Sequence, residues 1–230
     1  MERVAIEQKV LSENDRIAGE LRQRFAEEST LALNFISSPG SGKTLFLERT
    51  LERLPRELAV AVLTGDLQTD NDARRLARCG FPVQQITTVG ACHLDARMVE
   101  RALREWAGRR FDLLLIENVG NLVCPTSYDL GEAAKVVLLS VTEGEDKPLK
   151  YPGAFRRSSA MILNKIDLLP YVPFDMELAR TNARLIHPGI DVFETSCTTG
   201  AGLAEWMEWL SGRVSLCHAE GPASRTSSLQ

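Results

Sequence analysis

Short apolar runs alternate along the chain with longer stretches in which apolar residues recur every three or four positions. Apolar runs of about four to eight residues are typical of buried strands, and the amphipathic stretches between them are typical of helices. Strands are expected at 31–36, 58–63, 83–86, 111–116, 135–141, 160–163 and 191–194, and helices at 43–54, 70–79, 94–108 and 203–211. This alternation predicts an α/β fold, in which a mostly parallel sheet is covered by helices on both faces.

The chain before the first expected strand has a helical pattern of its own. Apolar residues recur at helical spacing over 4–28, which predicts an amphipathic helix that begins or restarts near Ser12 or Asn14. The small, polar residues at the other end of the chain predict a segment without fixed structure. The expected parts are a helical extension over 1–28, one α/β domain over 29–215 and a disordered tail over 216–230.

Composition narrows the classes of protein. The 230 residues, 44% of them hydrophobic and 25% charged, contain enough apolar material for one sizeable core. The net charge of −4 argues against a dedicated nucleic-acid binder, and no apolar window approaches the length of a membrane span. The first residues are charged, so no secretory leader is expected. Five cysteines without regular spacing favour reduced thiols, and therefore a cytoplasmic protein. Because of the charge and the lack of an apolar span, no nucleic-acid or membrane partner is expected.

The segment that follows the first expected strand has the pattern of a phosphate-binding loop. Its glycines allow backbone N–H groups to converge on phosphate oxygens, and the next helix adds the positive end of its dipole. The lysine is placed to reach the β- and γ-phosphates, and the threonine hydroxyl to bind Mg²⁺. Ser37 replaces the usual first glycine, and the alternative is a glycine-rich turn that ends in Gly-Lys-Thr by chance. The loop residues are Ser38, Pro39, Gly40, Ser41, Gly42, Lys43 and Thr44.

Two further strand ends indicate that the nucleotide carries guanine. The sequence NKID after the sixth expected strand matches the Asn-Lys-x-Asp motif of GTPases. The Asp167 carboxylate is suited to accept hydrogen bonds from N1–H and N2–H of guanine, a pair of donors that adenine lacks. Asn164 is expected to brace the loop, and the Lys165 stem to cover the base. Ser196 and Cys197 resemble the loop that contacts the guanine O6 oxygen, although Cys197 is better explained as a small buried residue beside the base than as a ligand.

Acidic residues at two other strand ends are candidates for binding Mg²⁺. Glu117 follows a buried strand and Gly120 comes three residues later, which resembles the Glu-x-x-Gly form of the second switch segment of GTPases. Glu117 would hold Mg²⁺ directly or through water, while Gly120 turns its N–H toward the γ-phosphate. Asp66 stands at the first-switch position as a second acidic partner. The catalytic set is Lys43, Thr44, Asp66 and Glu117, unless both acids are only turn residues.

Thiol and imidazole groups form a third candidate site. Cys92 and His93 stand before an expected helix, and Cys124 lies seven residues beyond Glu117. Both segments leave the same edge of the sheet, although each residue taken singly is also explained as structural. Two thiolates and one imidazole suit Zn²⁺ and can also hold Ni²⁺, with a fourth position open or filled across a dimer. The residues expected to take no part are Cys79, Cys217 and His218.

Together these segments resemble the HypB family, the hydrogenase nickel-incorporation GTPases, within the SIMIBI class of P-loop NTPases. The resemblance spans residues 10–202 and is carried by VLSENDRIAGELRQRF, SSPGSGKT, GDLQTDNDARR, GACHLDARMV, LLLIENVGNLVCP, DLGE, SVTEGEDKPLKYP, NKIDLLPYV and TTGAGL. The segment ENVGNLVCP, with the Cys-His pair upstream, is more specific than any general GTPase motif. Ser37, which is unusual in a phosphate loop, is ordinary for this family.

The resemblance implies slow GTP hydrolysis to GDP and a homodimer that forms on binding GTP. It also implies insertion of Ni²⁺ into the large subunit of nickel–iron hydrogenase, with a HypA-type zinc-binding accessory protein, through the Cys-His pair and the later cysteine. No cysteine or histidine precedes Cys79, so the nickel-storage role of many relatives is not expected. Lys147 and Lys150 match a family loop that reaches a neighbour's nucleotide, or are simply solvated lysines.

Two alternatives stay open. One is a GTPase chaperone for another metalloenzyme, of the urease or cobalamin-enzyme type, against which the ENVGNLVCP segment favours hydrogenase. The other is a metal-binding or storage protein with a vestigial nucleotide fold. The complete guanine set argues against that second alternative.

Overall fold

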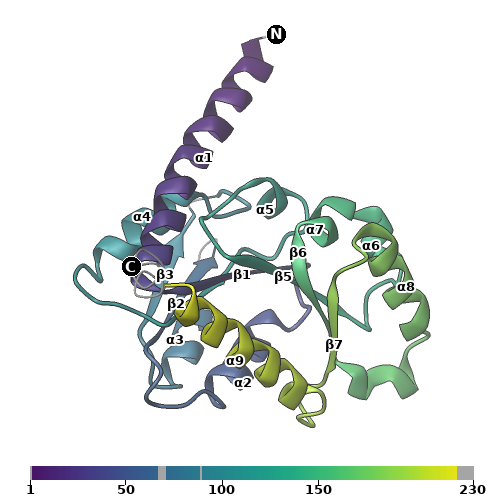
Figure 1. Cartoon of the computed structure of the whole chain (residues 1–230). Helices are drawn as coiled ribbons and strands as arrows, with labels where there is room; N and C mark the ends of the chain where they lie inside the picture. The colour runs from purple at the N-terminus through teal and green to yellow at the C-terminus, as the bar shows by residue number, and fades with distance from the viewer. Residues whose placement is uncertain (1, 67–70, 89, 222–230) are drawn as a thin grey trace, which may run out of the picture.

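The computed structural model describes residues 2–66, 71–88 and 90–221, with side chains from residue 9 onward. Figure 1 shows its helices and strands. The strands are β1 (Leu31–Ser37), β2 (Val60–Asp66), β3 (Val83–Thr87), β4 (Leu113–Glu117), β5 (Ala134–Ser140), β6 (Ser158–Asn164) and β7 (Asp191–Thr195). The helices are α1 (Glu2–Glu28), α2 (Lys43–Leu51), α3 (Asn71–Ala77), α4 (Ala96–Arg104), α5 (Cys124–Ser127), α6 (Lys147–Lys150), α7 (Pro152–Arg156), the 3₁₀ helix η1 (Ile166–Tyr171), α8 (Met176–Ile186) and α9 (Leu203–Ala219).

One seven-stranded sheet organises the molecule, in the order β3-β2-β4-β1-β5-β6-β7 (Figure 1). Every pair of neighbouring strands is parallel. Each of the seven expected strands is present, so the predicted α/β architecture is confirmed. Because the strands are parallel, their carboxyl ends lie along one edge, where ligands of such folds bind.

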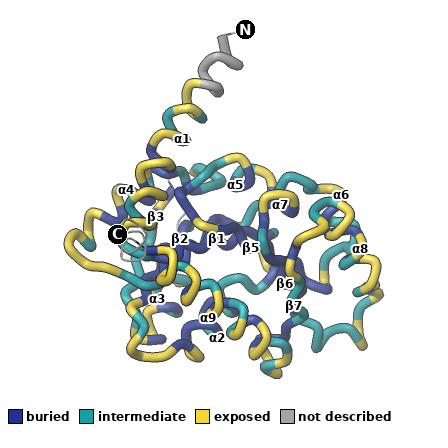
Figure 2. The backbone as a smooth tube through the Cα atoms, viewed as in Figure 1, coloured by how far each residue is buried: buried dark blue, intermediate teal, exposed yellow. Residues whose placement is uncertain are grey.

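The central strand β1 is buried on both faces, which explains its apolar sequence. Leu33 and Phe35 belong to the core cluster formed with α2 and α9, whereas Ala32 belongs to the cluster formed with α1 and α4. This division follows from the two-residue period of a strand. Figure 2 shows the sheet as the buried centre of the molecule, with the exposed positions on the surrounding helices and loops.

The sequence pattern does not predict the helices between β4 and β7. Helices α5, α6 and α7 have four or five residues each, too few to show a helical period. Helix α8 buries Ala179, Asn182 and Ala183, so its buried positions hold no large apolar side chain of the kind on which the helix predictions rest. The shortness of α5, α6 and α7 and the small or polar buried residues of α8 explain why the sequence pattern does not predict these helices.

The second half of α1 is part of the core. Figure 1 shows its first turns projecting from the body of the molecule. Further along, Ile17, Leu21 and Phe25 are buried with residues of α4. The segment expected to be an extension thus forms part of the cover of one sheet face.

Helix α9 is longer than predicted, and this corrects the expected start of a disordered tail at residue 216. The pattern predicts an end near Ser211, whereas the helix continues to Ala219. Cys217 packs against the core, and His218 Nε2 lies 3.1 Å from Asp112 Oδ1. These tertiary contacts keep Cys217 and His218 in the helix, although the composition of the segment predicts no ordered structure. The rest of the expected tail, 222–230, lies outside the described residues.

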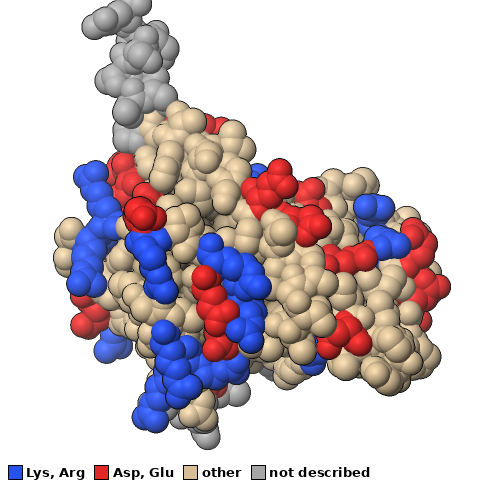
Figure 3. Space-filling model, turned by 90° about the horizontal axis from the view of Figure 1, so that it is seen from below, with Lys and Arg blue, Asp and Glu red and all other residues tan. Residues whose placement is uncertain are grey.

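The surface carries both signs of charge. On the face in Figure 3, lysine and arginine side chains gather toward the left and acidic side chains toward the right, so neither sign covers it. Among the described helices, none has the length and apolar character that a membrane span requires.

Phe25→Ala tests whether α1 belongs to the core. Phe25 is 5% exposed, so we expect the free energy of unfolding to fall by about 3–5 kcal/mol, as for other buried phenylalanines. The matched control is Val10→Ala in the same helix, because Val10 is 51% exposed and should change it by less than about 0.5 kcal/mol. Urea denaturation measures both, and equal effects would show that α1 is an appendage.

Candidate nucleotide and metal site

The candidate residues meet at the carboxyl edge of the sheet. The phosphate loop leaves β1, which lies between β4 and β5 and marks the point where the winding of the sheet reverses. A cleft of about 290 Å³ is lined by the loop together with Gly120, Asp72 and Arg75. The segments that the sequence assigned to phosphate and to the second switch therefore share one cleft.

Two glycines are required by close packing around the loop. Gly42 has a φ of 94°, and a Cβ atom there would lie 2.6 Å from Asn164 Nδ2. A Cβ atom on Gly120 would lie 3.2 Å from Pro39 Cα. Only glycine accommodates both the left-handed conformation and this approach at position 42. The loop is thus packed against the base-binding segment on one side and the second-switch segment on the other.

Glu117 joins the end of β4 to the phosphate loop. Its side chain is 2% exposed, and its Oε1 accepts hydrogen bonds from Thr44 Oγ1 at 2.6 Å and Lys43 Nζ at 3.2 Å. Within the described part of the chain, Glu117 Oε2 and Ser41 Oγ are buried without a hydrogen-bond partner. A buried carboxylate oxygen beside a threonine hydroxyl and a lysine fits Mg²⁺ and a phosphate chain. Asp66 ends β2, and residues 67–70 of the expected first switch lie outside the described residues.

The NKID segment contacts the phosphate loop directly. Asn164 Nδ2 donates to Ser41 O at 3.0 Å, and Lys165 Nζ donates to Gly40 O at 2.6 Å. Lys165 adopts a left-handed backbone with φ of 64°. These contacts are those expected of a bracing asparagine and of a lysine stem that lies across the site.

Asp167 is held by the loop after β7. Ser196 Oγ donates to Asp167 Oδ1 at 2.5 Å and accepts a hydrogen bond from Thr199 N at 3.1 Å. Cys197 is buried, with its Sγ 3.5 Å from Asn164 Oδ1. Burial raises the pKa of the Cys197 thiol to about 11, so the thiol is neutral near pH 7. Its environment is that of the small buried residue that the sequence left as the alternative.

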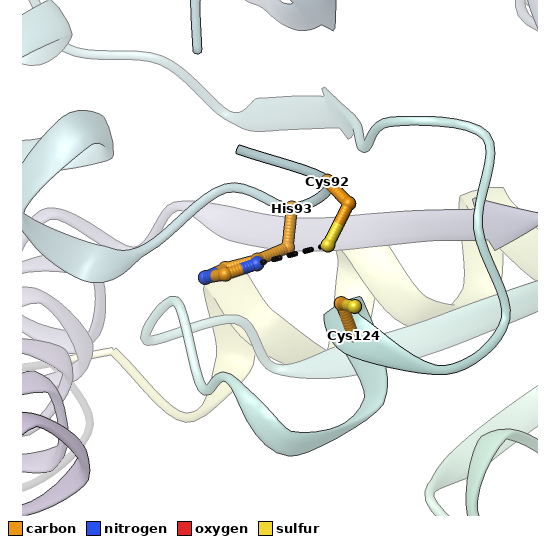
Figure 4. A group of neighbouring side chains, drawn as sticks. All are labelled: Cys92, His93 and Cys124. Atoms are coloured by element: carbon orange, nitrogen blue, oxygen red, sulfur yellow. Dashed lines mark hydrogen bonds between the residues drawn. The ribbon is translucent and has the colours of Figure 1, made fainter. Parts of the chain in front are cut away.

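Figure 4 shows Cys92, His93 and Cys124 around a common point. Their ligand atoms all lie within 4.8 Å of one another, and Cys92 Sγ is 3.8 Å from His93 Nδ1. The first two residues come from the loop before α4, and Cys124 begins α5. Among the described residues this is the group of three or more such side chains that is close enough to hold a metal ion. The structure therefore brings together the three predicted ligands.

The protonation of this group suits a metal site. The hydrogen bond with Cys124, followed by burial, raises the pKa of Cys92, as expected where two thiols compete for protons. Burial lowers the pKa of His93, which favours the neutral imidazole that binds metals. A divalent ion displaces the thiol protons and removes the repulsion between the thiolates.

Residues that the sequence reasoning missed support the metal ligands. The ring of Tyr128 stacks on His93 with 3.8 Å between ring centres. Asn121 Nδ2 donates to Cys92 O at 3.4 Å, while its Oδ1 accepts from Val123 N at 2.8 Å. Nothing in a single sequence marks these two residues, although Asn121 lies inside the most specific segment.

The sequence and the fold are similar to those of known nucleotide-binding proteins. The family profile described as "CobW/HypB/UreG, nucleotide-binding domain" matches residues 32–194. A hydrogenase maturation factor HypB from Azotobacter chroococcum is 53% identical over 207 residues, which are 90% of this chain and 68% of that protein. The crystal structure of HypB from Helicobacter pylori in complex with nickel is 41% identical, with a TM-score of 0.82 over 88% of this chain and 95% of the other.

A distant likeness bears on the fold alone. The signal recognition particle 54 kDa protein from Aeropyrum pernix, in complex with GDP, is 12% identical, with a TM-score of 0.53 over 78% of this chain and 46% of the other. Together with the closer structure, it confirms the predicted P-loop NTPase fold of the SIMIBI class.

Gly42→Ala tests the packing of the phosphate loop against the NKID segment. An alanine at either Gly42 or Gly40 pays about 1–2 kcal/mol for the left-handed backbone. Only at position 42 does the new Cβ meet Asn164, whereas nothing lies within 4 Å of a Cβ at Gly40. We expect urea denaturation without nucleotide to show a larger loss of stability for Gly42→Ala than for Gly40→Ala. Equal losses would mean that the approach to Asn164 is not a constraint.

Proposed function

The chain belongs to the HypB branch of the CobW/HypB/UreG family, and we propose that it is a GTPase that delivers nickel during maturation of nickel–iron hydrogenase. The observation that carries the proposal is the clustering of Cys92, His93 and Cys124. Cys124 lies in the same segment as Glu117, seven residues later, and the Glu117 carboxylate is hydrogen-bonded to the phosphate loop. A metal group and a nucleotide site are thus built on one continuous stretch of chain.

The phosphate loop binds and orients GTP in this proposal. Thr44 and Glu117 hold Mg²⁺ with Asp66 as a further acidic partner, and Lys43 neutralises the β- and γ-phosphates. The bound ion neutralises charge that develops on the phosphate oxygens. Gly120 lies beside Pro39 and lines the cleft, and in this proposal its N–H turns toward the γ-phosphate.

Intrinsic hydrolysis is proposed to be slow. Phosphoryl transfer depends on positioning and on positive charge at the transition state, which fast GTPases reach with an added arginine. Arg75 lines the phosphate cleft, but its guanidinium is bound to Glu48 Oε2 at 2.6 Å. That ion pair directs the charge of Arg75 away from the phosphates.

Nickel is the cargo rather than a resident cofactor. Two thiolates and one imidazole leave a coordination position open for a donor from another protein. Zn²⁺ prefers a tetrahedral set of such ligands, whereas Ni²⁺ also accepts a square-planar set, so a shift of one ligand can favour one ion. A site with three ligands from two segments is suited to transfer.

Contact with other proteins is supported by the surface beside the metal ligands. Val123, next to Cys124, is 61% exposed, so the segment that carries this ligand is accessible to another protein. The proposed partners are a second copy of the chain when GTP is bound, a HypA-type accessory protein and the hydrogenase large subunit. The five free thiols fit the reducing conditions of the cytoplasm, where we place this chain.

The role of the Lys147 and Lys150 loop stays a proposal. Lys147 Nζ lies 3.3 Å from Glu143 and over the ring of Tyr151, while Lys150 pairs with Asp146 at 2.7 Å. Both lysines have acidic partners within their own segment. Either would exchange that partner for phosphate if the loop reached a neighbour's nucleotide.

Asp167→Asn tests the selection of guanine. The amide presents a donor to the N1–H and N2–H groups of guanine, so GTP affinity should fall by about 1–3 kcal/mol, the cost of an unpaired polar group. Xanthosine triphosphate, which has a carbonyl at C2, should bind better to the variant than to the unaltered chain. Fluorescence titration with both nucleotides measures this exchange, and an unchanged preference for GTP would exclude the NKID assignment.

Double replacement of Cys92 and Cys124 by serine tests the metal site. Serine keeps the size of cysteine but removes the thiolates, so competitive chelator titration should show Ni²⁺ and Zn²⁺ affinities at least about tenfold weaker. The matched control is the Cys79→Ser, Cys217→Ser variant, whose residues pack on the core away from the three ligands. Equal binding by the two double variants would remove the metal from the proposed function.

A further inference from the structure

Leu94 lies between the metal ligands and both strand ends that carry the switch segments. It follows His93 directly, and its side chain is fully buried. A Cβ atom on Gly65 would lie 2.8 Å from Leu94 Cδ2, so the side chain rests on the glycine that precedes Asp66. The Leu94 backbone N–H donates to Asn118 Oδ1 at 3.1 Å. One residue therefore contacts the end of β2 through its side chain and the segment after β4 through its backbone.

Asn118 is itself held by three hydrogen bonds, one of them from Leu94 N. It directly follows Glu117 and is 1% exposed. Its Oδ1 also accepts from Val119 N at 3.0 Å, and its Nδ2 donates to Asn34 Oδ1 at 3.2 Å. Rotating this amide would leave several buried polar groups unpaired, at a cost of about 1–3 kcal/mol each. The side chain therefore has one stable orientation.

The network continues below Asn118 into the core. Asn34 Nδ2 donates to Glu132 Oε1 at 3.1 Å, and that carboxylate is paired with Lys135. Glu132 Oε2 accepts from Leu130 N at 2.6 Å. A buried ion pair with further hydrogen bonds is a rigid anchor, because removing any member leaves an unpaired charge. Asn34 therefore fixes the amide nitrogen of Asn118, while the amide oxygen of Asn118 binds the backbone N–H of Leu94.

We infer that Asn118 is a positioning residue that couples the nucleotide to the metal ligands, an inference that rests on the proposed function. Thr44 and Lys43 hydrogen-bond to Glu117, and they are the groups that the loop offers to Mg²⁺ and phosphate. A change in their contact with Glu117 rotates the backbone of Glu117 and Asn118 about the contact with Asn34, and the fixed Asn118 amide passes that rotation to the Leu94 backbone. His93 then shifts relative to Cys124.

The measurement is the dissociation constant of Ni²⁺ and of Zn²⁺ by chelator competition, with GDP and with a non-hydrolysable GTP analogue. Coupling between two sites is typically about 5- to 150-fold, and we expect a ratio of that order in the unaltered chain. In Asn118→Ala the ratio should fall at least about threefold toward one, because Leu94 N loses its acceptor while the bond of Asn121 to Cys92 O remains. Asn118→Asp retains the acceptor for Leu94 N but loses the donor to Asn34 Oδ1, so its ratio should lie between those of Asn118→Ala and the unaltered chain.

Asn182→Ala is the matched control. Asn182 is also a buried asparagine whose amide donates to a backbone oxygen, that of Glu145 at 2.9 Å, but it lies on α8. Its replacement should lower stability and leave the ratio unchanged. If Asn118→Ala does not fold, Asn118→Ser takes its place, because serine keeps a polar group but is too short to reach Leu94 N.

The outcomes separate the inference from the function on which it rests. A folded Asn118→Ala or Asn118→Ser variant with the ratio of the unaltered chain overturns the role of Asn118 and leaves the GTPase and the metal site standing. A ratio of one in the unaltered chain overturns the coupling itself. Unchanged metal binding in the Cys92→Ser, Cys124→Ser variant would overturn the proposed function, and this result does not depend on Asn118.

Discussion

The carboxylate of Glu117 is the interaction on which the site depends. It is almost fully buried, and a buried carboxylate is stable only with charged or hydrogen-bonding partners. Lys43 and Thr44 supply them, so the phosphate loop and the end of β4 are held as one unit. Any ligand that draws these two groups away must leave another positive partner beside the carboxylate. Burial of this carboxylate therefore favours a cation beside it, which agrees with the proposed Mg²⁺.

Much of the site is predictable because a parallel sheet places the ends of its strands along one edge. The strands are visible as apolar runs, and the assigned phosphate, guanine and magnesium residues stand within a few positions of a strand end. Local motifs at strand ends therefore carry three-dimensional information. The three metal ligands were predicted to meet for the same reason, since both their segments leave that edge.

The sequence does not show which residue forms a hydrogen bond with each buried polar group. Asn118 and Leu94 are 24 positions apart, and Asn118 and Asn34 are 84 apart, so no local pattern links them. The stacking of Tyr128 on His93 has no signal at all. The end of α9 was misplaced for the same reason, because contacts with the core and with Asp112 extend it beyond its amphipathic region.

The division of the metal ligands between two segments argues for transfer over storage. A storage site gains affinity when all its ligands are fixed relative to one another. Here Cys92 and His93 belong to the loop that Asn118 holds, and Cys124 begins α5, so the set changes when the segments shift. Coupling between binding sites is reciprocal, so the ion alters nucleotide affinity by the same factor as the nucleotide alters ion affinity. In the proposed function a loaded metal site would favour one nucleotide state, and hydrolysis would give the release of the ion its direction.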